Sequence, residues 1–170
     1  MLYTIDLQGM EFHAFHGCYD LEQRVGNRFE VTLSITTELG GIAAHDAVEE
    51  AVKYTKERVQ FGRRISQFQN TQFQLAEMHT RMQAAQFLVY SAAMKKQNHE
   101  PYSMDAAMAK LFAAEAASDV TRRAVQLFGG YGYTREYPVE RMMRDAKITE
   151  IYEGTSEVQR MVIASHLGVK

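Results

Sequence analysis

The residues best placed for chemistry lie in a short turn, Ile151-Tyr-Glu-Gly154, which carries the carboxylate of Glu153. Just beyond it, Ser156 and Gln159 have the spacing of a capping box, which predicts that the last helix begins here. A carboxylate that is held close to a substrate and shielded from water can remove a proton. A glutamate before a helix is, however, more commonly a solvated partner of the helix dipole. Position alone favours this second role for Glu153.

A second group of residues could approach a phosphate. The guanidinium of Arg58 can pair with two phosphate oxygens, and Gly129 and Gly130 allow a ligand to come close to the backbone. The same two glycines follow Leu127 and Phe128 at the end of an apolar segment, which is also the pattern of a helix C-cap. Taken by themselves, these features indicate a surface charge and the end of a helix.

The elements that must position these residues are a pair of strands and a series of helices. Apolar and polar residues alternate over residues 2–12 and 28–39, which predicts an antiparallel hairpin with a bulge or bend at Gly9. Apolar residues then recur at helical spacing, which predicts helices over residues 67–97 and from Ser103, as its cap, to about 127. Two more helices are predicted over residues 138–148 and 156–167, and Pro138 suits the first position of the earlier one.

The predicted fold class is therefore α+β. Residues 1–43 form a β-hairpin segment, and residues 44–170 form an up-and-down bundle of four or five helices. A helix over residues 44–61 joins the two parts, because its regular register can continue through a junction.

Composition excludes several classes of protein. The net charge of −2 gives no sign of a nucleic-acid partner, and no apolar run is long enough for a membrane span. The N-terminus lacks the layout of a signal peptide, and Cys18 is the only cysteine, so we expect a cytoplasmic protein without an internal disulfide. Residues 1–50 carry nine acidic and two basic side chains, a net −7, whereas the remaining 12 acidic and 17 basic give +5. This imbalance suggests that the two parts have different histories.

Three motifs in the helical part resemble those of one enzyme family. They are Glu50-Ala-Val-Lys-Tyr-Thr-Lys-Glu-Arg-Val-Gln-Phe-Gly-Arg-Arg-Ile65, Tyr131-Gly-Tyr-Thr-Arg-Glu-Tyr-Pro-Val-Glu-Arg141 and Arg144-Asp-Ala-Lys-Ile-Thr-Glu-Ile-Tyr-Glu-Gly-Thr-Ser-Glu-Val-Gln159. Residues 42–170 resemble the C-terminal helical domain of the short-chain, butyryl-CoA type of acyl-CoA dehydrogenase, flavoproteins that oxidise an acyl thioester to its α,β-unsaturated form. The resemblance implies that Glu153 is the catalytic base and that Gly154 contacts the substrate. It also implies an FAD site formed by Arg58, Gln60, Gln69, Gln126, Leu127, Phe128, Gly129, Gly130, Thr155, Ser156 and Glu157.

The first 54 residues resemble a different family, the dihydroneopterin aldolases, which are lyases of folate synthesis. The matching segments are Leu7-Gln-Gly-Met-Glu-Phe12, His16-Gly17, Glu22 and Gly26-Asn-Arg-Phe-Glu-Val31. The resemblance implies functional roles for Glu22 and Tyr54, although the aldolase lysine has no counterpart, which favours a loop kept for folding. His13 and His16 have no clear third ligand near them, so we expect no metal site.

Residues 44–54 fit both families, and we therefore interpret the chain as a composite, engineered protein joined within this helix. We expect an acyl-CoA dehydrogenase domain that is inactive by itself and binds FAD poorly, because the family's other domains have no counterpart here. The alternatives are a designed fold without activity and a partial aldolase. We also expect a homo-oligomer, acyl-CoA binding only when the other domains are supplied, and no nucleic-acid or membrane partner.

Overall fold

The N-terminal part of the chain forms a two-stranded antiparallel hairpin. The computed structural model describes residues 4–14, 27–36 and 40–169. Strand β1 (Thr4–Ala14) pairs with β2 (Asn27–Thr36), with Thr4 opposite Thr36 and His13 opposite Arg28. The pairing shifts between Leu7 and Met10, where β1 contains one residue more than β2. The predicted hairpin and the predicted bulge near Gly9 are thus confirmed.

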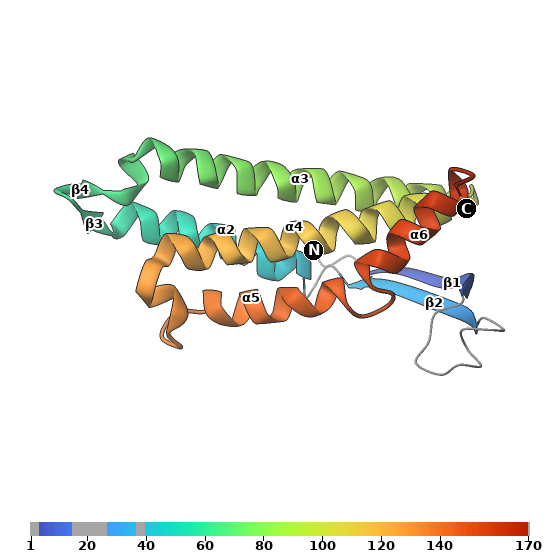
Figure 1. The fold of residues 1–170 in the computed structure, drawn as a ribbon. Helices are drawn as coiled ribbons and strands as arrows, with labels where there is room; N and C mark the ends of the chain where they lie inside the picture. The colour runs from blue at the N-terminus through green and yellow to red at the C-terminus, as the bar shows by residue number, and fades with distance from the viewer. Residues whose placement is uncertain (1–3, 15–26, 37–39, 170) are drawn as a thin grey trace.

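The rest of the described chain is mainly helical (Figure 1). Its helices are α2 (Gly40–Glu57), α3 (Gln69–Gln97), α4 (Ser103–Phe128), α5 (Val139–Lys147) and α6 (Ser156–His166). Short 3-10 turns connect them: η1 (Ile65–Gln67), η2 (Gly129–Tyr133) and η3 (Ile148–Glu150). The five described helices and the hairpin agree with the predicted combination of a hairpin and a helical bundle. Within the described residues, no helix has the length and apolar character that crossing a membrane requires.

Helix α4 is the centre of the bundle. It packs against α2, α3, α5 and α6, and Figure 1 shows it running between α3 and α5. Its contact faces consist largely of alanine, which allows neighbouring helices to approach closely. The buried alanines of α4 are Ala106, Ala107, Ala109, Ala114, Ala116, Ala117 and Ala124. Larger side chains fill the space around them, among them the fully buried Met78 and Val120.

Polar contacts fix the neighbours of α4 at its N-terminal half. The Lys95 ammonium on α3 binds both carboxylate oxygens of Asp105 at 2.8 Å. The Arg160 guanidinium on α6 pairs with Glu115. Because α6 is held here, the turn that precedes it is also held against α4.

The predicted first helix of the bundle is too long at its C-terminal end. It ends at Glu57, and a small hairpin follows, formed by β3 (Val59–Gln60) and β4 (Arg63–Arg64). Phe61 and Gly62 form its two-residue turn with φ of 53° and 78°. Two successive residues with positive φ are typical of a tight hairpin turn and are incompatible with a continuing helix.

Two predicted caps are displaced by one residue. Thr155 rather than Ser156 caps α6, since its side chain accepts a hydrogen bond from the Val158 backbone N–H at 3.4 Å. Ser103 is the first residue of α4, and its cap position is occupied by Tyr102 without a side-chain hydrogen bond. A threonine beside a serine offers the same capping chemistry, so sequence spacing alone did not distinguish them.

Candidate functional site

The Glu153 turn connects η3 with α6 and has a strained backbone. Glu153 has φ of 54° and Gly154 has φ of 90°. Glycine adopts this region freely, but a residue with a side chain pays about 1–2 kcal/mol for it. Within the described chain, Phe61 and His99 are the other non-glycine residues with positive φ. Strain at a residue with a reactive side chain supports a functional rather than a purely structural position.

Two buried side chains donate hydrogen bonds to the backbone of this turn. The Lys110 ammonium on α4 donates a hydrogen bond to the Gly154 carbonyl at 2.7 Å. The Gln159 amide on α6 donates to the carbonyls of Glu153 and Gly154 at 3.3 and 3.2 Å. Lys110 is 6% exposed and Gln159 is 1% exposed. The strained backbone is therefore fixed by donors from two different helices.

The charges around the turn act on one another. Withdrawal from water raises the pKa of Glu153, although its side chain is still exposed at the surface of the chain, and the nearby Lys110 partly opposes the rise. Burial lowers the pKa of Lys110, and this effect is opposed by Glu153, Glu150 and Glu157. Burial, with the Glu153 charge beside it, raises the pKa of Tyr152. Glu153 is thus a more basic carboxylate than an ordinary surface glutamate.

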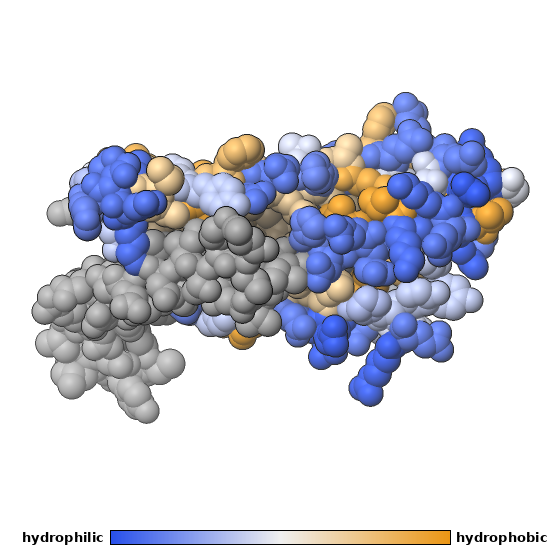
Figure 2. Space-filling view, turned by 180° about the vertical axis from the view of Figure 1, so that it is seen from behind, coloured by the Kyte–Doolittle hydropathy of each residue, from blue (hydrophilic) through white to orange (hydrophobic). Residues whose placement is uncertain are grey.

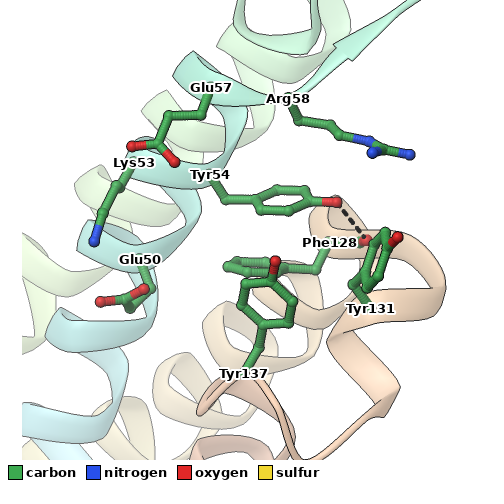
Figure 3. A pocket seen from close by; sticks show the side chains of 8 residues that line it. All are labelled: Glu50, Lys53, Tyr54, Glu57, Arg58, Phe128, Tyr131 and Tyr137. Atoms are coloured by element: carbon green, nitrogen blue, oxygen red, sulfur yellow. Dashed lines mark hydrogen bonds between the residues drawn. The ribbon is translucent and has the colours of Figure 1, made fainter.

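A second cluster lies at the other end of α4, around an open pocket of about 360 Å³ (Figure 3). The Tyr54 ring stacks on Phe128 at 4.1 Å, and the Tyr54 hydroxyl donates a hydrogen bond to the Phe128 carbonyl at 3.4 Å. The Arg58 guanidinium lies over the Tyr131 ring, 5.4 Å from its centre. Burial raises the pKa of Tyr54, against the opposing charge of Arg58. The complete lining is Glu50, Lys53, Tyr54, Glu57, Arg58, Phe128, Tyr131 and Tyr137.

The structure brings some of the predicted cofactor residues together. Arg58 and Phe128 line the same pocket, and Gly129 and Gly130 follow at the end of α4, where both are exposed. A side-chain carbon built on either glycine would meet no atom within 4 Å, so the backbone there is open to a ligand. Gln126 is exposed one turn earlier, close to this end of α4.

Other predicted residues lie elsewhere. Gln60 on β3 and Gln69 at the start of α3 are exposed and do not line the pocket. The beginning of α6, directly after the Glu153 turn, contains Thr155, Ser156 and Glu157. Lys110, which contacts the Glu153 turn, and Phe128, which lines the pocket, are 18 positions apart on α4, about 27 Å along a helix. The two clusters are therefore separate within one chain.

The prediction from sequence missed Lys110 and five side chains of the pocket: Glu50, Lys53, Glu57, Tyr131 and Tyr137. A signal for Lys110 is present in the sequence. It shares the helical stripe of Ala107, Ala114 and Ala117, all of which are buried. A lysine on an otherwise apolar stripe is expected to have a specific partner, because lysine is rarely buried without one.

The aldolase-like residues are divided between two regions. Glu22 and His16 lie outside the described residues, and the side chain of His13 is not described. Tyr54 belongs to the pocket of the helical bundle, where its hydroxyl and its ring both contact Phe128. The contacts of Tyr54 are thus contacts within the bundle.

Comparison with known proteins identifies the helical part. Residues 35–168 match the family model of the acyl-CoA dehydrogenase C-terminal domain. A short-chain-specific acyl-CoA dehydrogenase of Clostridium acetobutylicum is 57% identical over 135 residues, which are 79% of this chain and 35% of that protein. The chain thus spans about a third of the length of the curated relatives that it matches.

Solved structures agree. Butyryl-CoA dehydrogenase from Megasphaera elsdenii has a TM-score of 0.72 and 38% identity, and the match covers 96% of this chain and 49% of that one. An FAD complex of PigA has a TM-score of 0.72 and 29% identity, with 78% of this chain and 36% of that one covered. None of these findings supports the dihydroneopterin aldolase resemblance of residues 1–54.

Gly154 provides a test of the strained turn. We expect Gly154→Ala to lower the free energy of unfolding by about 1–3 kcal/mol, because alanine disfavours positive φ and weakens the hydrogen bonds that hold the turn. The added carbon would lie 2.8 Å from the Gln159 amide nitrogen, which must then move away. Urea denaturation followed by circular dichroism measures the change.

The matched control is Gly130→Ala. Gly130 does not have positive φ, and a side-chain carbon there meets no atom within 4 Å. The free energy of unfolding of the Gly130→Ala variant should stay the same or rise by up to about 1 kcal/mol. Equal stability of the two variants would contradict the description of the turn as strained.

Proposed function

The chain belongs to the acyl-CoA dehydrogenase family, and we propose that it serves in the FAD-dependent oxidation of short-chain acyl-CoA thioesters, with Glu153 as the catalytic base. The observation that carries this proposal is the Glu153 turn itself. A carboxylate of raised pKa extends from a strained backbone that two buried donors hold in place. Elevated basicity and fixed position are the properties that a general base requires.

In the proposed step, the Glu153 carboxylate takes the proton from the carbon next to the thioester carbonyl. A hydride leaves the adjacent carbon at the same time, which produces the double bond. FAD, when bound, supplies the acceptor for that hydride. We propose that Gly154, the next residue of the turn, contacts the substrate.

The Arg58 pocket fits part of an FAD molecule. Arg58 supplies a cation for a pyrophosphate, and Gly129 and Gly130 leave their backbone open beside it. The aromatic rings of the lining can contact a nucleotide base by stacking. Glu50 and Glu57 balance the charges of Lys53 and Arg58, so the pocket by itself attracts an anion only weakly.

Thr155, Ser156 and Glu157 are proposed to contact the cofactor near Glu153. Because Lys110, which contacts the Glu153 turn, and Phe128 of the pocket are about 27 Å apart along α4, we propose that one FAD molecule is held by residues of two copies of the chain. This arrangement requires a homo-oligomer.

A composite origin of the chain stays a hypothesis. The charge imbalance between residues 1–50 and the remainder supports it. The match to butyryl-CoA dehydrogenase argues against it, because its 96% coverage extends beyond the family model into the hairpin. The partial-aldolase alternative gains no support, and the observed contacts of Tyr54 are explained by the bundle alone.

The proposed function is tested in a hybrid enzyme. Residues 43–170 replace the corresponding C-terminal domain of butyryl-CoA dehydrogenase, and oxidation of butyryl-CoA is measured with an artificial electron acceptor. We expect turnover by the hybrid and a loss of at least about 100-fold in the Glu153→Gln variant, because a general base typically contributes this much. The control is Glu100→Gln, at an exposed position of the segment between α3 and α4. A folded, FAD-loaded hybrid whose turnover is unaffected by Glu153→Gln would contradict the role of Glu153.

The 170-residue chain by itself should bind FAD weakly. Exposed polar contacts contribute only about 1 kcal/mol each, whereas association costs roughly 4–15 kcal/mol. We therefore expect a dissociation constant no lower than about 1 mM by isothermal titration calorimetry, and no oxidation of acyl-CoA. A micromolar dissociation constant that Arg58→Ala abolishes would contradict this expectation and favour a complete site in these residues.

Self-association is expected from the surface of α3. Phe87, Tyr90 and Met94 are spaced along one side of this helix, and Phe87 is 69% exposed. Figure 2 shows hydrophobic side chains at the surface of the bundle among hydrophilic ones. Exposed apolar stripes of this kind tend to be buried between subunits.

Light scattering at micromolar concentration measures the association state. We expect a dimer or a larger species, and a shift toward monomer in Phe87→Lys but not in the charge-changing control Glu49→Lys on α2. A wild-type monomer under these conditions would contradict the proposed oligomer.

A further inference from the structure

Lys110 is the buried cation beneath the Glu153 turn. Its ammonium, on α4, lies 2.7 Å from the Gly154 carbonyl oxygen, and its side chain is 94% buried. We propose that Lys110 is a positioning residue for Glu153: it holds the Gly154 carbonyl and thereby fixes the backbone from which the Glu153 carboxylate extends. This inference rests on the proposed role of Glu153 as the base.

Burying the Lys110 cation has a cost in free energy. Lysine is among the residues least often buried, and taking an ammonium out of water is unfavourable unless it is paired. Every neighbour of Lys110 on its helical stripe is alanine, so an apolar residue would suit the packing there better. A function that requires the charge explains a lysine at this place, whereas packing does not.

Two hydrogen-bond donors converge on one carbonyl. Lys110 from α4 and Gln159 from α6 both donate to the Gly154 oxygen. Gln159 also donates to the Glu153 oxygen. An isolated turn with positive φ at a glutamate relaxes toward more favourable angles, so these contacts are needed to keep it.

The charge of Lys110 also acts on Glu153. Glu150 on η3 and Glu157 on α6 act, together with Glu153, on Lys110, and the Glu153 charge acts on the neighbouring Tyr152. Partial withdrawal from water raises the pKa of Glu153, and the Lys110 charge limits the rise. Lys110 therefore holds the pKa of Glu153 below what burial alone would give, while its hydrogen bond to Gly154 fixes the turn.

The test uses carbon-13-labelled glutamate in the complete 170-residue chain, in which NMR follows the titration of the Glu153 carboxyl group. In Lys110→Met, the midpoint of Glu153 should move to higher pH, because the opposing cation is lost. Amide exchange at Tyr152 and Gln159, on either side of the turn, should accelerate about tenfold, as expected for loss of a hydrogen bond to a charged donor. Lys110→Arg, which keeps the charge, should restore the midpoint at least in part.

Two further variants separate position from charge. Gln159→Met removes the neutral donor and should accelerate amide exchange around the turn. Unlike Lys110→Met, it should leave the titration midpoint of Glu153 unchanged. Lys95→Met removes a lysine that pairs with Asp105 elsewhere on α4 and should change neither reading at the turn. If Lys110→Met leaves the midpoint and the exchange as in Lys95→Met, the proposal is wrong. Faster exchange throughout the bundle with an unchanged midpoint would mean a merely structural role.

The wild-type chain provides an independent reading should Lys110→Met fail to fold. On titration to alkaline pH, the signal of the Lys110 side chain and the amide signal of Thr155, which follows the bound carbonyl, should change with one common midpoint. Independent midpoints would overturn the proposal. These readings do not depend on turnover, so failure of the hybrid enzyme would count against the proposed function and not against the contact with Lys110.

Discussion

The structure depends on the small side chains of α4. Seven buried alanines let α2, α3, α5 and α6 approach one helix from several sides. One consequence is that the turn between η3 and α6 comes close enough for the Lys110 side chain to reach its backbone. A second is that the C-terminal end of α4 meets α2, where Tyr54 stacks on Phe128. Both candidate sites are therefore products of the same close packing.

The sequence predicted the elements well because their signals are local. Helical spacing and the glycines after Phe128 identified α3 and α4, and alternation identified β1 and β2. The bounds of the first bundle helix were less accurate. The helix was predicted to continue to residue 61, yet it ends at Glu57 and the chain turns back at Phe61 and Gly62 with positive φ.

The candidate sites were predictable only in part, because a linear motif identifies residues and not their neighbours. The family resemblance pointed to Glu153 and Arg58. Helical spacing could not predict that Lys110 contacts the Glu153 turn, or that Tyr137 lines the same pocket as Arg58. Both relations depend on which helix faces meet, and this is set by packing over long sequence separations. The resemblance of residues 1–54 to an aldolase rests on short motifs, and those that the structure describes lie on a hairpin, an arrangement common to many folds.

The environment of Glu153 bears on two opposing requirements of the base that we propose it to be. A carboxylate in water is ionised at neutral pH but weakly basic, whereas a fully desolvated one is strongly basic but protonated. Glu153 lies between these limits, because partial burial raises its pKa and Lys110 restrains the rise. A neutral donor at position 110 could hold the Gly154 carbonyl, but it could not supply the restraint. The charge of Lys110 limits the pKa of Glu153 and its hydrogen bond holds the Gly154 carbonyl, so one cation on the central helix supplies both effects.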